Sequence, residues 1–185
     1  MIGTDLARAL ADHALLHGDF VLRSGRRSSY YLDKYLFETR PEVLAPLGER
    51  IASCVAEHEP DAVRIASPEL GAVALAAATA LASGMPFLIV RKEAKSYGTA
   101  KRLEGAFEPG ERVCLVEDVV TSGGAAIDSV KALRDAGLEC GTAVCVVDRE
   151  EGAADALARH AVRLRPLFRA SELLAGAKTA AQPHG

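Results

Sequence analysis

The stretch Val113–Ala125, VCLVEDVVTSGGA, constrains the fold more than any other part of the chain. It opens with four apolar residues typical of a strand that is covered on both faces, as in parallel sheets. Two carboxylates, Glu117 and Asp118, follow, and a glycine-rich turn then leads into residues 125–137, whose apolar positions have helical spacing. This order of strand, turn and helix predicts an α/β fold with a doubly wound, mainly parallel sheet.

The turn between that strand and helix is suited to bind a phosphate group. Backbone N–H groups at a helix N-terminus lack intrahelical partners and carry positive potential. Thr121 and Ser122 add hydroxyl donors, while Gly123 and Gly124 allow positive φ and close approach of a ligand. The turn has neither the lysine of a Walker A loop nor a GxGxxG fingerprint. An acidic pair just before an anion site suits a sugar phosphate, and the alternative is an ordinary turn with a solvated acidic pair.

The same stretch resembles the phosphoribosyl pyrophosphate (PRPP) motif of type I phosphoribosyltransferases. The resemblance implies that Glu117 and Asp118 face the ribose hydroxyls, with Asp118 as a catalytic residue, and that the turn holds the 5-phosphate. The PRPP-binding positions that it implies in this stretch are Glu117, Asp118, Val119, Val120, Thr121, Ser122, Gly123, Gly124 and Ala125.

Length and composition limit the other classes of protein. The 185 residues, 49% of them hydrophobic, predict one domain. Within it we expect an N-terminal helix and hairpin (1–40), a core (41–176) and a loose tail (177–185). The formal net charge of −3 provides no basic field for nucleic acid or an anionic membrane. The expected first helix, Thr4–His17, carries charged residues, so we expect neither a signal peptide nor a membrane span, and a cytoplasmic protein. The four cysteines form no CxxC pair and are expected as small buried hydrophobic residues, and no dedicated metal cage is visible.

A second segment, FVLRSGRRSSYYLDKYLF, narrows the resemblance. Two short runs flank a turn of serine, glycine and arginine, which predicts a small hairpin outside the main sheet. The segment is similar to the hood of orotate phosphoribosyltransferases, which lies over the base. The similarity implies that Arg23, Tyr30, Tyr31, Thr121 and Arg149 contact orotate. Arg149 follows an apolar run and has glutamates beside it, so an ion pair is the alternative for this side chain.

The stretch from Arg91 to Gly105, RKEAKSYGTAKRLEG, is basic in an acidic chain, since five basic minus two acidic residues give +3. Its weak apolar periodicity and its glycines predict a mobile lid, and the alternative is a solvated, partly helical segment. It resembles the flexible catalytic loop of orotate phosphoribosyltransferases. The resemblance implies that Arg91 and Lys95 reach the site of a partner subunit, that Lys92 acts in its own site and that Lys95 is catalytic. The PRPP-binding positions that the resemblance implies in this loop are Arg91, Lys92, Lys95 and Tyr97, and Tyr97 stands where many relatives have histidine.

The turn Ser67–Gly71 follows another predicted strand, 62–66, and precedes an alanine-rich helix. In the similar family this turn helps to bind pyrophosphate, and some members carry a lysine there. This chain has none in the turn, so the expected contacts come from backbone N–H groups near Leu70, Gly71 and Ala72.

Together the resemblances imply an orotate phosphoribosyltransferase of pyrimidine (UMP) biosynthesis. It would convert orotate and PRPP to orotidine 5-monophosphate and pyrophosphate, as a homodimer, with Mg²⁺ bound mainly through PRPP and water. Two alternatives are a phosphoribosyltransferase that acts on a purine or on uracil, and a non-catalytic regulator that senses PRPP. The hood and Arg149 favour orotate, and the single helix before Phe20 offers a regulator little to bind DNA with.

Overall fold

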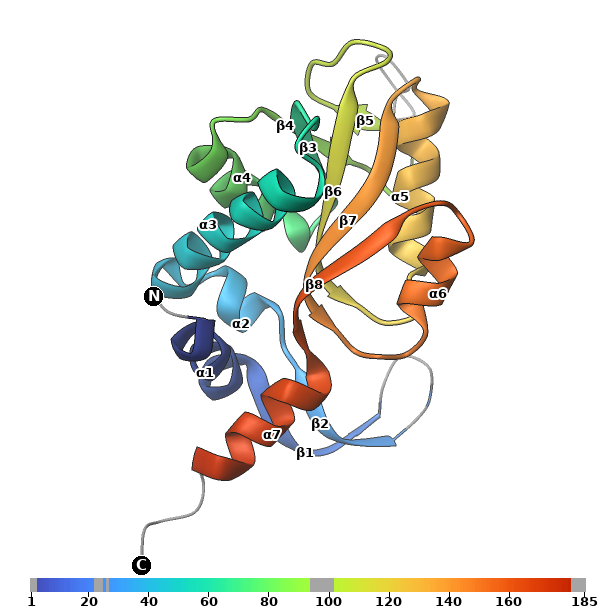
Figure 1. The fold of residues 1–185 in the computed structure, drawn as a ribbon. Coiled ribbons are helices and arrows are strands. Elements are labelled where there is room, and N and C mark those ends of the chain that lie inside the picture. The colour runs from blue at the N-terminus through green and yellow to red at the C-terminus, as the bar shows by residue number, and fades with distance from the viewer. Residues whose placement is uncertain (1–2, 22–24, 26, 94–101, 181–185) are drawn as a thin grey trace, which may run out of the picture.

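The computed structural model describes residues 3–21, 25, 27–93 and 102–180. Its large sheet is built from β3 (Arg64–Pro68), β4 (Phe87–Val90), β5 (Leu103–Glu104), β6 (Arg112–Val120), β7 (Glu139–Asp148) and β8 (Arg163–Arg169). Among the described residues the strand order is β5-β4-β3-β6-β7-β8, with only the β4–β5 pair antiparallel. The predicted α/β fold with a mainly parallel sheet is therefore confirmed (Figure 1).

Helices cover both faces of this sheet (Figure 1). One face carries α3 (Pro41–His58) and α4 (Ala72–Ser83), and the other carries α5 (Gly124–Asp135) and α6 (Ala153–Ala158). The apolar spacing of residues 41–58, together with Pro41, whose missing N–H has no cost in a first turn, predicts a helix with the bounds that α3 has. α3 and α4 approach closely, because a Cβ on Gly48 would lie only 2.6 Å from the carbonyl carbon of Ala78.

The N-terminal region confirms the predicted hairpin. β1 (Leu15–Val21) pairs antiparallel with β2 (Arg27–Leu32), apart from the large sheet. The hairpin lies at one end of the molecule with α1 (Gly3–Ala14), α2 (Tyr35–Glu38) and α7 (Ala170–Ala180) around it (Figure 1). This arrangement matches the hood expected from the sequence.

The first and last helices, and the strand expected at 62–66, differ from our predictions; that strand is β3 and runs from Arg64 to Pro68. The first helix ends at Ala14, not at His17, because residues 15–17 pair with β2 and the side chain of Leu15 is buried. The last helix runs from Ala170 to Ala180 and so enters the stretch predicted as a loose tail. Leu173 is buried in the core, which anchors the first part of this helix.

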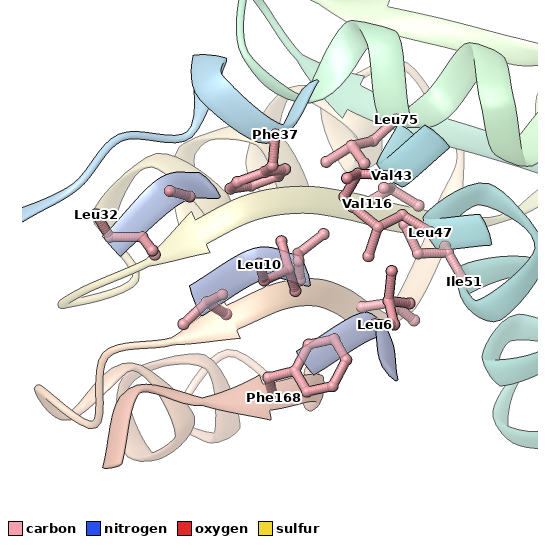
Figure 2. Packing of buried hydrophobic residues seen from close by; sticks show 14 of the residues in the cluster. Leu6, Leu10, Leu32, Phe37, Val43, Leu47, Ile51, Leu75, Val116 and Phe168 are labelled. Carbon is pink, nitrogen blue, oxygen red and sulfur yellow. The ribbon is translucent and has the colours of Figure 1, made fainter. Parts of the chain in front are cut away.

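The hydrophobic core lies on both sides of the sheet, and neighbouring residues of β6 contribute to opposite sides. Val116 joins a cluster with Leu10, Leu47 and Phe168, drawn in Figure 2. Leu115 joins a second cluster with side chains of α5 and α6. This two-sided burial is what the apolar run of residues 113–116 predicted.

β6 is longer than predicted and contains the acidic pair. The sequence predicted the strand to end at Val116, but pairing with β7 continues to Val120 opposite Asp148. Glu117 and Asp118 are therefore held in regular strand geometry near the C-terminal end of β6.

The predicted burial of the cysteines holds for three of the four. Cys114, Cys140 and Cys145 are buried in strands, and Cys54 is half-buried on α3. None of the described helices combines the length and apolar character needed to cross a membrane.

Candidate active site

A cleft of about 390 Å³ opens where β6 ends and α5 begins. Gly123, the residue before α5, has φ of +84°, which explains a glycine at this position. Gly124 is already the first helical residue, and the space around its Cβ position is open. The cleft is lined by Glu117, Val119, Val120, Thr121, Ser122, Gly123, Gly124, Ala125 and Ala126. The structure thus brings together the PRPP-binding residues predicted in this stretch, apart from Asp118.

The chemistry of this cleft suits a phosphate group. Thr121 and Ser122 are exposed, so their hydroxyls are available to an incoming ligand. The first backbone N–H groups of α5 have no intrahelical partners and lie at the positive end of the helix dipole. No side chain caps the N-terminus of α5 at Gly123. A phosphate in the cleft can therefore accept hydrogen bonds from both hydroxyls and backbone.

Glu117 and Asp118 are both buried, but they have different surroundings. Glu117 lines the cleft, where burial and then the charge of Asp118 raise the pKa of its carboxyl to about 8. Asp118 Oδ2 forms an ion pair with Lys34 Nζ at 2.5 Å, and Oδ1 accepts a hydrogen bond from the backbone N–H of Val119. Successive residues of a strand point to opposite sides, which accounts for this division.

Arg149 lies at the C-terminal end of β7, beside the cleft. Its backbone N–H donates to the carbonyl of Val120, 2.9 Å away, at the end of β6. Its guanidinium carbon lies 5.4 Å from the ring centroid of Tyr30 in the hood, and its Nε lies 3.2 Å from Glu151 Oε1. The ion pair with a nearby glutamate, which was the alternative for Arg149, is therefore present. The same guanidinium also faces the hood, where the predicted contact with the base would lie.

The other predicted orotate residues lie in different places. Tyr31 packs against Phe20, with ring centroids 5.6 Å apart, so the structure brings Tyr30 to Arg149 and keeps the side chain of Tyr31 within the hood. Arg23 lies outside the described residues.

Both ends of the predicted lid are anchored beside β4. The backbone N–H of Arg91 donates to the carbonyl of Arg102, and the Arg91 side chain faces Glu104 and Glu69 at 3.4 and 4.0 Å. The backbone N–H of Lys92 donates to Glu69 Oε1. Residues 94–101, with the predicted site residues Lys95 and Tyr97, lie outside the part of the chain that the structure describes.

Sequence reasoning missed three residues that surround Asp118. Lys34 was read only as part of the hood motif, Glu38 received no role, and Gly71 was expected to contribute its backbone. In the structure Lys34 pairs with Asp118, Glu38 is buried close to both, and Gly71 leaves room for the pair. The sequence held no local signal for these roles, because Lys34 and Gly71 reach Asp118 only through the packing of segments that are distant along the chain.

Carboxylate oxygens near the cleft can accommodate a magnesium ion that arrives with a phosphate ligand. Mg²⁺ takes one or two carboxylates together with phosphate oxygens and water, and Glu117 and Asp118 offer such oxygens. Within the described ranges, no group of three or more His, Cys, Asp and Glu side chains is arranged as a metal site.

Comparisons with known proteins agree on one family. The chain is 48% identical over 161 residues to the orotate phosphoribosyltransferase of Methanocella arvoryzae, covering 87% of this chain and 90% of the relative. It is 49% identical over 171 residues to that of Halobacterium salinarum, covering 92% and 95%. No family model matches the chain.

Solved structures give the same result. The crystal structure of orotate phosphoribosyltransferase from Aeropyrum pernix superposes with a TM-score of 0.83 at 34% identity and covers 96% of this chain and 99% of the other. The Mycobacterium tuberculosis orotate phosphoribosyltransferase, crystallised with Fe(III) dicitrate, also gives 0.83, at 32% identity, and covers 92% and 98%.

Proposed function

The chain belongs to the orotate phosphoribosyltransferase family, and from this premise we propose how its residues carry out the transfer of orotate onto PRPP. This reaction of pyrimidine biosynthesis yields orotidine 5-monophosphate and pyrophosphate. The observation that supports the proposal best is the cleft at the end of β6, which joins a phosphate-binding turn to the buried carboxyl of Glu117. The predicted base-binding residue Arg149 lies at the end of the next strand, β7.

In this proposal each part of PRPP has its own contacts. Thr121, Ser122 and the first N–H groups of α5 hold the 5-phosphate, and Glu117 and Asp118 accept hydrogen bonds from the ribose hydroxyls. Orotate lies under the hood against Arg149, whose positive charge complements the carboxylate of the base.

The protein contributes mainly position and charge. As pyrophosphate departs, the ribose carbon gains positive character, and the anionic base attacks it. Holding both reactants in place removes much of the entropic barrier, and basic groups stabilise the departing charge. We assign that second role to the segment that begins with Arg91 and Lys92 and contains Lys95, with Lys95 as its catalytic residue.

Magnesium dependence follows from the charge of the substrate. Bound mainly through PRPP and water, Mg²⁺ supplies positive charge to the diphosphate. Removal of the ion with a chelator is expected to abolish turnover, and an excess of Mg²⁺ is expected to restore it. Turnover that persists in the chelator would contradict this part of the proposal.

We further propose a homodimer in the cytoplasm. This proposal is supported by the resemblance of residues 91–105 to the family's catalytic loop, which implies that Arg91 and Lys95 act in the site of a partner subunit and so requires two chains. The multiply charged substrates do not cross lipid unaided, so the enzyme is expected in the compartment that holds them. Measuring the mass in solution under assay conditions tests the assembly, and an active monomer would contradict it.

The assay follows the ultraviolet absorbance of orotate with PRPP and Mg²⁺, with hypoxanthine and uracil as competing bases. We expect orotate to be consumed and the other bases to remain. Consumption of a purine or of uracil in place of orotate would favour a phosphoribosyltransferase that acts on that base. Binding of PRPP without turnover of any base would favour a regulator.

A further inference from the structure

Lys34 joins the hood to the acidic pair of β6. It immediately precedes α2, and its Nζ lies 2.5 Å from Asp118 Oδ2, a residue far away in the sequence. The Asp118 side chain is almost fully buried, while that of Lys34 is 34% exposed. The Lys34 side chain is therefore partly open to a ligand, and its ammonium group is already directed at the predicted ribose-binding carboxylate.

The same ammonium lies beside the turn that follows β3. A Cβ on Gly71 would lie 2.0 Å from Asp118 Oδ2 and 2.4 Å from Lys34 Nζ. The absence of a side chain at Gly71 therefore leaves room for the ion pair. Because the turn 67–71 contains no basic side chain, Lys34 brings a cation to it from another part of the chain.

The surroundings of Lys34 are rich in carboxyl groups. Glu38 is buried, its Oε1 has no hydrogen-bond partner among the described residues, and burial followed by the charge of Asp118 raises its pKa to about 9. Partial burial opposes the positive charge of Lys34, but the hydrogen bond and charge of Asp118 outweigh it and raise the pKa of the amine. Lys34 is thus charged at neutral pH, and a ligand with more negative charge than Asp118 can compete for it.

The sheet order indicates which part of PRPP reaches Lys34. β3 and β7 flank β6 on opposite sides. Arg149 and Tyr30, the proposed base contacts, lie at the β7 side, and Gly71 follows β3. In a displacement at the ribose carbon, the attacking base and the departing diphosphate lie on opposite sides of that carbon. The diphosphate is therefore expected on the β3 side, beside Lys34.

We propose that Lys34 binds the diphosphate of PRPP, exchanging Asp118 Oδ2 for a diphosphate oxygen and thereby freeing that carboxylate for the ribose hydroxyls. The inference rests on the proposed function, since it assigns one more contact within the same site. In this proposal Lys34 and Asp118 pair with each other until the diphosphate and the ribose hydroxyls replace that contact.

The test compares ligands with and without a diphosphate. Calorimetry measures the binding of PRPP, inorganic pyrophosphate and ribose 5-phosphate, each with Mg²⁺, to the unmodified protein and to Lys34→Met and Lys34→Arg. Because a charge-assisted hydrogen bond is lost, Lys34→Met is expected to weaken PRPP and pyrophosphate by about tenfold or more. Ribose 5-phosphate should change by less than about twofold, and Lys34→Arg should retain most of the pyrophosphate affinity. Lys131→Met, at an exposed lysine of α5, is the matched control.

Equal weakening of all three ligands would overturn the proposal, because it would mean that Lys34 only orders Asp118. Unchanged pyrophosphate affinity would also overturn it. If the unmodified protein bound no PRPP, the proposed function would fail together with this inference. If the unmodified protein bound PRPP and Lys34→Met bound PRPP and pyrophosphate equally well, only the inference would fail.

A second measurement needs no variant. Acetylation of Lys34 by acetic anhydride, followed by peptide mass spectrometry, reports how accessible the amine is. Pyrophosphate with Mg²⁺ should slow the modification of Lys34, and ribose 5-phosphate should not. Equal protection by both ligands, or by neither, would contradict direct contact with the diphosphate.

Discussion

The guanidinium of Arg149 lies over the ring of Tyr30, 5.4 Å from its centroid, so that the hood touches the C-terminal end of β7. Only one-tenth of the Arg149 side chain is exposed, and Glu151 lies 3.2 Å from its Nε. The stacking and the ion pair fix the guanidinium before a base arrives. A group held in this way loses little freedom on binding, which favours affinity.

Removing the ring of Tyr30 should loosen Arg149 and weaken orotate binding. Since a cation–π contact of this kind contributes about 0.5–2 kcal/mol, Tyr30→Leu should raise the KM for orotate by about 2–30-fold. The KM for PRPP should change little. Steady-state kinetics with each substrate varied in turn measures both values.

Tyr30→Phe is the matched control, because it keeps the ring and removes only the hydroxyl. It should retain nearly the KM of the unmodified enzyme. A Phe variant as impaired as the Leu variant would show that the hydroxyl, not the ring, supports the site.

Adding one methyl group at Gly71 should disable the site. The new carbon would meet Asp118 Oδ2 and Lys34 Nζ, so the ion pair must separate or move. Because displacements of about 1 Å in a site can cost about 100-fold in rate, we expect Gly71→Ala to lower kcat/KM on that order. Gly176→Ala in α7, where the Cβ position meets open space beyond the helix's own backbone, should leave kcat/KM unchanged. Normal activity of Gly71→Ala would contradict this packing.

Glu38 should make the protein less stable as the pH rises. Its folded pKa is about 9 against an ordinary value of 4.5, and burial is the main cause. Between these values the unfolded carboxyl is ionised and the folded one protonated, so folding takes up a proton. The stability that depends on protonated Glu38 is fully present below pH 4.5 and is lost as the pH rises towards 9. Glu117, whose pKa is raised to about 8, acts in the same direction.

Thermal unfolding from pH 5 to pH 9 checks this dependence. Glu38→Gln removes one titrating group, so its melting temperature should fall less over this range and exceed that of the unmodified protein at pH 9 by about 2–6 °C. Glu49→Gln, at an exposed position of α3, is the control and should follow the unmodified protein. Identical pH profiles for all three proteins would contradict the assignment.

A substitution near Glu59, at the end of the sheet opposite the site, should lower stability without changing activity. Glu59 is buried after α3, accepts a hydrogen bond from the Thr142 hydroxyl and pairs with Arg112 at 3.3 Å. Thr142→Val leaves a buried carboxylate oxygen without that donor and should cost about 1–3 kcal/mol. The melting temperature should fall by about 2–4 °C per kcal/mol, while kcat and both KM values should not change.

Thr142→Ser keeps the hydroxyl and should lose less stability than Thr142→Val. A large loss of activity in either variant at temperatures where it is folded would contradict the separation of this end of the sheet from the site.

The sequence predicted those features that depend on neighbours along the chain. The α3 helix, the hairpin and the strand, turn and helix around Gly123 follow from periodicity, proline and glycine placement, and all are present. The end of β6 was wrong, because the pairing with β7 that carries the strand to Val120 depends on a segment distant in sequence.

The least predictable part of the site is the group around Asp118. Lys34 and Gly71 lie beside Asp118 only because the hood and the turn after β3 pack against β6, and no local sequence pattern predicts that packing. Burial of Glu38 likewise depends on how α2 packs, because a four-residue helix has no periodicity to interpret. The predicted roles of Lys95, Tyr97 and Arg23 stay predictions, since these residues lie outside the described ranges.

The most direct test of the whole account is calorimetric titration of the unmodified protein with PRPP in the presence of Mg²⁺. If the turn 121–125 and the acidic pair hold the sugar phosphate, the titration should give a saturable heat with one PRPP bound per chain. The absence of any binding heat at several temperatures, with the protein shown to be folded, would contradict the account.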